Sequence, residues 1–216
     1  MTVSQPEAVF NLSFAAQIVN PKEEDTKQLN KRLQWQIDNP LHRLRFVQLD
    51  IKSLKLIVFT DSSFANNQDL SSQMGFVIVL ADKNNRANIL HWSLIKCKRV
   101  THSVLASELY AMTYRFDIAA AIKSTIKKIL QIQLLIILCT DSKSLYDCLV
   151  KLGTTQEKRL MVDLMCLRQL YKRHKIAEIK WINRNTNSAD TITKSKPCSA
   201  LRTLLDTNAV NIQVTE

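Results

Sequence analysis

The sequence predicts an α/β fold in which a mixed β-sheet is flanked by helices. Two observations carry this prediction. Apolar runs of strand length, at residues 56–61 and 134–140, alternate with longer segments whose apolar residues recur at helical spacing, such as 103–121. The expected order is three strands, a helix, a strand, two helices, a strand and a helix, and 216 residues are enough to enclose its core.

The first three strands are expected to be consecutive. Residues 56–61 are followed by strands at 75–80 and 87–92, and the polar turn at 82–86 joins the latter two into a hairpin. Residues 103–121 form the predicted first helix of the domain. The next strand, at 134–140, is apolar throughout, as expected when both of its faces are covered.

The remaining segments are mostly helical. Residues 145–152 and 157–172 have helical spacing, 176–182 reads as the last strand, and a terminal helix is predicted from Ser188 onward. Upstream, residues 1–50 are predicted to contain short helices. One of these has an acidic first turn after Pro21 and ends before Pro40.

The charge distribution divides the chain. Lysine and arginine number 30 against 19 aspartates and glutamates, a net charge of +11, which favours a polyanionic partner. The first fifty residues carry six basic and six acidic side chains, so the whole excess lies in residues 51–216. We therefore expect a helical tail at 1–50, a domain at 51–205 and a C-terminal tail at 206–216.

Composition excludes several classes of protein. Gly75 and Gly153 are the only glycines, which rules out glycine-rich phosphate-binding loops. The five cysteines include no C-x-x-C pair, so the sequence indicates neither a zinc knuckle nor a disulfide framework. No apolar run approaches the length of a membrane span, and the expectation is a protein with no membrane partner.

Acidic residues interrupt the apolar pattern at four places. Asp61 and Asp141 each stand in a Thr-Asp-Ser sequence at the end of a predicted strand, where ligand sites of α/β sheets collect. The ordinary alternative for either is a turn or helix-capping role. Glu108 falls on the apolar stripe of its helix, where a carboxylate needs a base, a metal ion or a position at the edge of the core. Asp190 stands in the first turn of the last helix, where the dipole also favours an acid.

Together these four residues suggest a metal centre. Oxygen ligands without histidine or cysteine favour Mg²⁺ or Mn²⁺. Four carboxylates can hold two such ions roughly 3.5–4 Å apart, the arrangement that serves in-line displacement at phosphorus. The predicted catalytic and metal-binding residues are Asp61, Glu108, Asp141 and Asp190.

The order of these acids resembles the Asp-Glu-Asp-Asp set of ribonuclease H. The sequence around these acids resembles one branch of that family, the ribonuclease H domain of copia-type retrotransposon polyproteins. Among these, it resembles fungal elements most closely. Four segments carry this resemblance: residues 58–65, 91–93, 105–110 and 187–194. Residues 1–50, including 29–35, resemble the region that connects the upstream reverse transcriptase to this domain.

The resemblance implies a fold, an activity and partners. The fold is the ribonuclease H-like one, a five-stranded mixed sheet with three antiparallel and two parallel strands. The activity is metal-dependent endonucleolytic cleavage of the RNA strand of RNA–DNA hybrids, with two Mg²⁺ ions or Mn²⁺ in their place. The implied setting is intracellular: reverse transcription beside an upstream reverse transcriptase, in cytoplasmic particles or in the nucleus.

Three departures from the family lie near Asp190. The loop at residues 183–187 lacks the histidine of cellular ribonucleases H, Arg184 stands where copia-type relatives often have glycine, and Ser188 where they often have proline. These changes predict a looser surrounding of Asp190, with strain at Arg184 if the turn needs a positive φ. A weakened or silent remnant that only binds nucleic acid is therefore the alternative function.

Several residues near the acids are candidates for binding nucleic acid. The basic run Lys96, Lys98 and Arg99 precedes the Glu108 helix and is the preferred phosphate-contacting segment. Polar side chains beside the acids are predicted to donate hydrogen bonds to phosphates or to the 2′-hydroxyls that distinguish RNA: Ser62, Ser63, Asn66 and Ser142.

A retroelement integrase core is a third, distant possibility. That fold orders its acids Asp, Asp, Glu, and Glu178 follows Asp141 by 37 residues, near the expected interval. Glu178 stands, however, in an alternating strand pattern rather than in a helix, so a cross-strand pairing with lysine is the simpler role.

Overall fold

The computed structural model describes residues 5–18, 20–39, 43–65, 70–194 and 198–215. Its strands are β1 (Lys55–Ser63), β2 (Gln73–Ala81), β3 (Ala87–Lys96), β4 (Leu135–Thr140) and β5 (Glu178–Trp181). Its helices are α1 (Val9–Gln17), α2 (Glu23–Asp38), α3 (Val104–Leu130), α4 (Lys143–Val150), α5 (Met161–Lys172), α6 (Asp190–Thr193) and α7 (Ala200–Thr207). Short 3-10 turns occur at Pro6–Ala8, Ile51–Ser53, Lys158–Leu160 and Arg184–Thr186.

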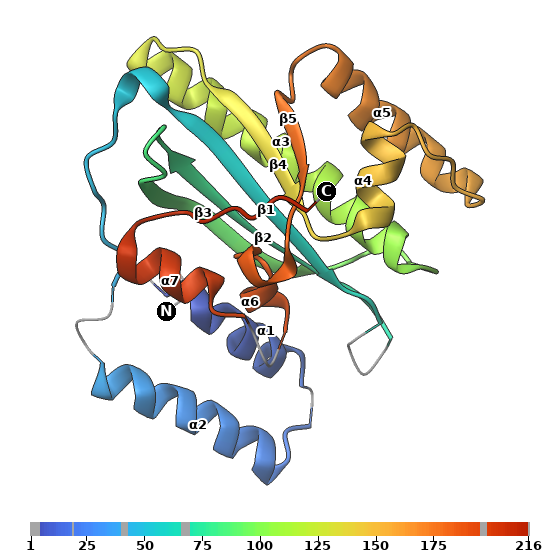
Figure 1. Cartoon of the computed structure of the whole chain (residues 1–216). Coiled ribbons are helices and arrows are strands. Elements are labelled where there is room, and N and C mark those ends of the chain that lie inside the picture. Colours follow the sequence, from blue (N-terminus) through green and yellow to red (C-terminus); the bar gives the residue numbers. More distant parts are fainter. Residues whose placement is uncertain (1–4, 19, 40–42, 66–69, 195–197, 216) are drawn as a thin grey trace.

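The strands form one five-stranded sheet in the order β3-β2-β1-β4-β5 (Figure 1). The strand β2 pairs antiparallel with both β1 and β3, whereas β4 runs parallel to both β1 and β5. The predicted fold class, a mixed sheet of three antiparallel and two parallel strands flanked by helices, is therefore confirmed. The parallel strands follow helical crossovers, as parallel pairing requires.

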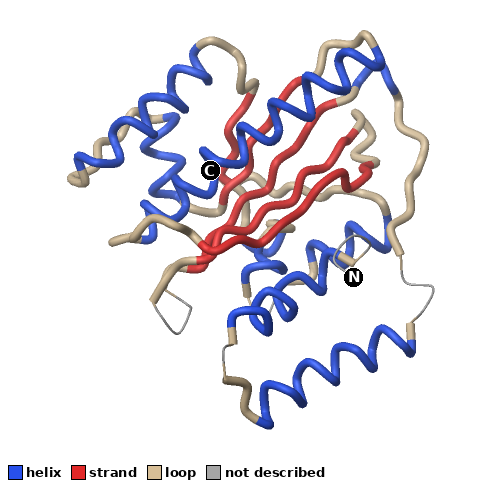
Figure 2. The backbone as a smooth tube through the Cα atoms, turned by 180° about the vertical axis from the view of Figure 1, so that it is seen from behind, coloured by secondary structure: helices blue, strands red, loops and turns tan. Residues whose placement is uncertain are grey.

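Helices cover both faces of the sheet. Alternate residues of a strand point to opposite faces, so Leu56 and Val58 of β1 pack with α3, α4 and α5, and Ile57 and Phe59 pack on the side of α1, α6 and α7. Figure 2 shows the long helix α3 running along the strands on the first of these faces. Because both faces are covered, all residues of β1 after Lys55 are buried.

Among the described residues of the first fifty, the α-helices are α1 and α2, and residues 43–50 are not helical. Val9 of α1 is buried in the core of the second face, whereas α2 has no buried residue and lies outside α1 (Figure 1). At the other end, the chain after α7 returns to the sheet, where Ile182 pairs with Val214. No described helix combines the length and the apolar character needed to cross a lipid bilayer.

Two helices differ from the prediction. The helix expected at 103–121 continues to Leu130, because isoleucines at helical spacing keep packing on the sheet until Gln131 adopts a left-handed cap with φ 56°. The terminal helix expected from Ser188 is instead the single turn α6 and the separate helix α7. The sequence between them contains Pro197, which lies outside the described residues and is incompatible with an uninterrupted helix.

Candidate functional site

The three aspartates expected at the sheet edge meet there. Asp61 lies in β1, Asp141 directly follows the parallel strand β4, and Asp190 is the first residue of α6. One carboxylate oxygen from each lies within 4.8 Å of the others. The register that pairs Phe59 with Cys139 explains the first two, because it brings Asp61 and Asp141 to neighbouring positions on adjacent strands.

Asp61 is held by donors from α6 and from the residue after it. Its side chain is almost fully buried, the Thr193 hydroxyl donates to Oδ2, and Lys194 Nζ lies 3.2 Å from Oδ1. Asp61 pairs with Gly75 of β2, and a Cβ atom added at Gly75 would lie 2.3 Å from the Thr193 methyl carbon. Gly75 therefore lets α6 pack close enough to the sheet for Thr193 to reach Asp61.

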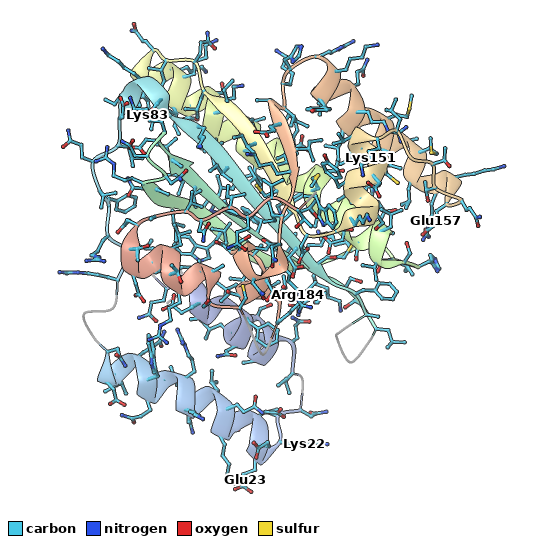
Figure 3. All side chains as sticks on the ribbon, in the orientation of Figure 1. Lys22, Glu23, Lys83, Lys151, Glu157 and Arg184 are labelled. Carbon is cyan, nitrogen blue, oxygen red and sulfur yellow. The ribbon has the colours of Figure 1, made fainter. Side chains whose placement is uncertain are left out.

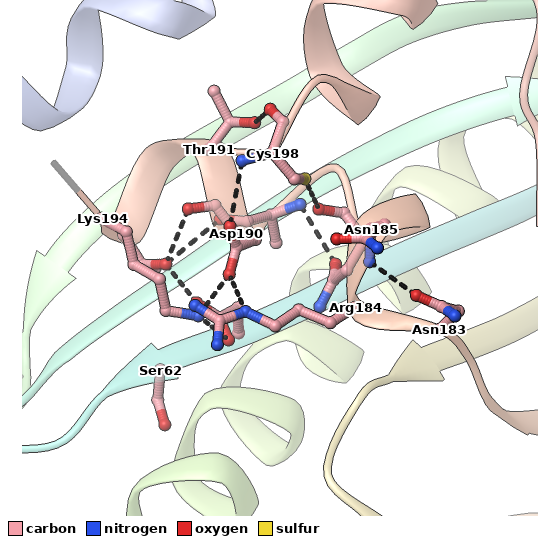
Figure 4. Close-up of polar contacts among 12 residues, drawn as sticks. Ser62, Asn183, Arg184, Asn185, Asp190, Thr191, Lys194 and Cys198 are labelled. Carbon is pink, nitrogen blue, oxygen red and sulfur yellow. Dashed lines mark hydrogen bonds and ion pairs between the residues drawn. The ribbon is translucent and has the colours of Figure 1, made fainter. Parts of the chain in front are cut away.

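Asp190 is held by three donors. Its Oδ1 accepts from Arg184 Nε at 3.0 Å and from Lys194 Nζ, and its Oδ2 accepts from the backbone N–H of Cys198 at 3.2 Å. Figure 4 shows the Arg184 and Lys194 side chains converging on this carboxylate. The expected looseness around Asp190 is thus not what the structure shows. Arg184 begins a 3-10 turn and is not among the residues with positive φ, so it carries no left-handed strain.

Glu108 approaches the cluster from the α3 side of the sheet. Its side chain is buried, Oε1 accepts from the backbone N–H of Ser62 at 3.2 Å, and Oε2 has no hydrogen-bond partner among the described residues. Glu108 is not one of the residues whose oxygens lie within 4.8 Å of one another. It lies instead against the strand segment that carries Asp61.

Burial and mutual repulsion shift the pKa values of three of these acids upward. Burial raises the pKa of Asp61 to about 6, with the charge of Lys194 opposing the shift and that of Asp141 adding to it. Burial, followed by the charges of Asp61 and Asp141, raises the pKa of Glu108 well above its ordinary value. Burial also raises the pKa of Asp141. These carboxylates are therefore costly to ionise without a nearby cation.

Asp190 behaves differently. Burial alone would raise its pKa, but the hydrogen bond and charge of Lys194, together with Cys198 N–H and Arg184, hold the pKa of Asp190 below its ordinary value. Burial would likewise lower the pKa of Lys194, yet the charges and hydrogen bonds of Asp61 and Asp190 raise it. The cluster is a network of buried negative charge compensated by two basic side chains.

The residues present fit a divalent cation. The donor set consists of carboxylate oxygens with no sulfur or imidazole, which suits Mg²⁺ or Mn²⁺ better than zinc. The orphaned Glu108 Oε2 is a second indication, because a buried carboxylate oxygen without a donor is normally costly. Asp61, Asp141 and Asp190 can share one ion, and Glu108 borders their site.

The predicted nucleic-acid contacts lie in different surroundings. Ser62 and Ser63 are buried in β1, and the Ser62 hydroxyl pairs with that of Ser107 at 2.8 Å. Ser142 caps α4, its hydroxyl accepting from the backbone N–H of Leu145 at 3.4 Å. Asn66 lies outside the described residues.

The basic segment begins at the same edge of the sheet as the acids. Lys96 ends β3 in register with Gln73, which in turn pairs with Ser63 of β1. Lys96, Lys98 and Arg99 are exposed and border a cavity of about 320 Å³ between β3 and α3. Arg99 also binds Asp163 of α5 at 3.2 Å, so part of its charge is already paired.

Thr193, Lys194 and the side chain of Arg184 belong to the site although the sequence did not predict a role for them there. The signal was available for two of them. Thr193 and Lys194 follow Asp190 by three and four residues, the spacing that places side chains on one face of a helix. Arg184 offered no such signal, because its contact with Asp190 depends on how the loop after β5 folds back.

No protein-family model matches the chain, and no curated protein matches it. Solved ribonuclease H structures are similar to it. The RNase H1 named LC11, isolated from compost by a metagenomic approach, and RNase H1 from the archaeon Halobacterium salinarum are each 18% identical, with a TM-score of 0.49, covering 68% of this chain and 98% of theirs. The RNase H domain from Mycobacterium tuberculosis is 17% identical with a TM-score of 0.47, covering 70% and 99%.

Proposed function

We propose that the chain is a metal-dependent ribonuclease H that cuts the RNA strand of RNA–DNA hybrids. The observation that carries this proposal is the gathering of Asp61, Asp141 and Asp190, whose oxygens lie within 4.8 Å of one another at one sheet edge. A buried cluster of carboxylates can hold a divalent cation, and a net charge of +11 in the same chain favours a polyanionic substrate. Together these features suit phosphodiester hydrolysis.

The proposed ligands of two Mg²⁺ ions, or of Mn²⁺ in their place, are Asp61, Glu108, Asp141 and Asp190. Bound there, such ions would activate a water molecule and stabilise the leaving 3′-oxygen. Thr193 fixes the carboxylate of Asp61, and Arg184 fixes that of Asp190. Hydrolysis adds water across the bond between phosphorus and the 3′-oxygen, and it leaves 3′-hydroxyl and 5′-phosphate ends.

The basic segment is the proposed binding surface for the hybrid. Lys96 and Lys98 are exposed at the edge of the sheet that carries the acids, where they can contact phosphates. The further proposed contacts are Arg99, Ser62, Ser63, Asn66 and Ser142. Because Ser62 and Ser63 are buried, the exposed lysines supply most of the affinity in this proposal.

The test is cleavage of an RNA–DNA hybrid whose RNA strand is labelled at its 5′ end. We expect discrete RNA products in Mg²⁺ or Mn²⁺, and we expect Asp61→Asn to lower the rate more than roughly 100-fold while hybrid binding persists. Asp206→Asn is the matched control, because it makes the same change at an exposed side chain of α7. A folded wild-type chain that cuts hybrids in neither metal contradicts the proposal.

One observation favours the silent-remnant alternative. Lys194 and Arg184 already compensate the acidic cluster, so the site can persist without a metal ion. A remnant binds hybrids in a salt-dependent manner without turnover, and its binding is insensitive to substitution of Asp61 or Glu108. We also propose that the chain acts in a retrotransposon, beside an upstream reverse transcriptase. This part of the proposal rests on the four sequence segments that resemble copia-type elements.

A further inference from the structure

The Lys194 ammonium lies inside the acidic cluster. Its Nζ is 3.2 Å from Oδ1 and 3.1 Å from Oδ2 of Asp61, and it also pairs with Oδ1 of Asp190. The side chain is 24% exposed, against 2% for each of the two carboxylates it bridges. Lys194 is therefore the more exposed partner in these contacts, and Figure 4 shows its side chain running toward Asp190.

This position coincides with the one that a metal ion needs. Asp61 and Asp190 contribute two of the three oxygens that lie within 4.8 Å of one another. A divalent ion held by those oxygens would displace the ammonium, because both cations need the same atoms. Lys194 and the metal ion are thus alternative occupants of one site.

The surroundings permit the exchange. Lys194 directly follows the last residue of α6, and its flexible stem of four methylene groups can carry the charge away into solvent. Asp190 stays in place when the ammonium leaves, because Arg184 Nε holds Oδ1 at 3.0 Å and Cys198 N–H holds Oδ2 at 3.2 Å. Asp61 likewise keeps the Thr193 hydroxyl.

We propose that Lys194 is a resident counter-cation, which holds the acidic cluster together when no metal ion is bound and is displaced when one binds. The inference rests on the proposed function, because it takes the cluster to be a metal site. It has two consequences. The cluster is stable without metal at the cost of weaker metal binding, and removal of the ammonium reverses both effects because uncompensated carboxylates repel one another and attract a divalent ion.

The test is a calorimetric titration of the full chain with Mn²⁺, without nucleic acid. We expect Lys194→Met to bind Mn²⁺ at least roughly tenfold more tightly than wild type, and Lys194→Arg, which keeps the charge, to remain close to wild type. Lys180→Met is the control. It removes the same charge from a lysine that is 23% exposed and pairs with Glu178 on β5, and it should leave the affinity unchanged.

Thermal unfolding in EDTA provides a second measurement. Lys194→Met should melt at a lower temperature than wild type, and Mn²⁺ should raise its melting temperature by more than it raises that of wild type. If Lys194→Met is unfolded in EDTA, Mn²⁺ should restore its circular dichroism.

Three outcomes overturn the inference. Equal Mn²⁺ affinity of wild type and Lys194→Met overturns the role of Lys194 and leaves the proposed function intact. Failure of Mn²⁺ to refold an unfolded Lys194→Met has the same meaning. Absence of Mn²⁺ binding by both proteins overturns the inference together with the metal site on which the proposed function depends.

Discussion

The pKa values of Asp61 and Asp190 shift in opposite directions, although both carboxylates are buried in one cluster. Asp190 has three donors, and its pKa is held below the ordinary value in spite of burial. Asp61 has two, Thr193 and Lys194, and burial raises its pKa to about 6. The difference arises because Asp190 has the additional donors Arg184 and Cys198 N–H, whereas the charge of Asp141 adds to the raised pKa of Asp61. Of these two aspartates, it is therefore Asp61 whose ionisation lowers the stability of the fold.

This cost predicts a pH-dependent effect of Asp61→Asn on stability without metal. The folded pKa, about 6, exceeds the ordinary value of 3.8, so folded Asp61 binds its proton more tightly than unfolded Asp61 does. The contribution of Asp61 to the stability of the wild-type protein is fully present below pH 3.8 and is lost as the pH rises through 6. Asparagine cannot ionise. The free energy of unfolding of Asp61→Asn, relative to that of wild type, should therefore rise by on the order of 2–3 kcal/mol across this interval.

Urea unfolding in EDTA between about pH 4.5 and 7.5 measures this difference. Asp206→Asn, on the exposed face of α7, is the control and should show a constant offset from wild type. A difference between Asp61→Asn and wild type that does not vary with pH would mean that the folded pKa of Asp61 is ordinary.

At the scale of elements, the site depends on how closely α6 packs against β2. A Cβ atom at Gly75 would lie 2.3 Å from Thr193 Cγ2 and 3.0 Å from Ile192 Cγ1, both closer than packed carbon atoms approach. The single turn of α6 thus rests directly on the backbone of the strand that pairs with Asp61. Its position in turn sets that of Asp190, its first residue.

Gly75→Ala should therefore displace α6. We expect it to lower the free energy of unfolding by about 1–3 kcal/mol and to weaken Mn²⁺ binding, because Thr193 and Asp190 move away from Asp61. Adding Thr193→Ser should restore part of both losses, since serine removes the clashing methyl group and keeps the hydroxyl that donates to Asp61. Calorimetry and urea unfolding of the single and double variants check this, and equal losses in both would show that the methyl contact does not limit α6.

The sequence predicts the positions of the strands better than the exposure of their side chains. The strand that carries Asp61 and the strand that precedes Asp141 are predictable, because apolar runs of strand length stand out from helical periodicity. The sequence also predicts Ser62 beside the substrate, yet the Ser62 side chain is buried against α3. Alternation along a strand reveals exposure only when one face is open, and both faces of β1 are covered.

The limits at the site have a similar cause. Glu108 was recognisable because a carboxylate breaks an apolar stripe, whereas Lys194 after a short helix is an ordinary pattern for a solvated lysine. Its contact with Asp61 joins residues 133 positions apart, and no local pattern encodes such a contact. The full length of α3 and the division of the last helix were, in contrast, readable, because isoleucines continue at helical spacing beyond residue 121 and Pro197 interrupts the last helix.

At the scale of the whole molecule, the excess of positive charge lies in residues 51–216, which include the sheet. Residues 1–50 are neutral in total, and the charges of α2 are partly paired with one another, as in the ion pair of Lys27 with Glu23. Figure 3 shows Lys22 and Glu23 at the start of α2, on the outer side of the molecule, while Arg184 lies near its centre. A polyanion should therefore engage the face that carries the basic segment and the acids, not α2.

This distribution predicts which lysines control the salt dependence of hybrid binding. Each phosphate contact that is lost lowers the slope of log K against log salt by about 1. Lys98→Gln should lower the slope by about that amount and weaken binding at low salt, because Lys98 is exposed beside the sheet edge. Arg99→Gln should have a smaller effect, since Arg99 already pairs with Asp163 at 3.2 Å.

The control is Lys31→Gln, which removes an equal charge from α2 and should leave the slope unchanged. Fluorescence anisotropy measures the binding of all three variants, with Asp61→Asn as the non-cleaving background. Equal slopes for Lys98→Gln and Lys31→Gln would place the hybrid elsewhere on the molecule.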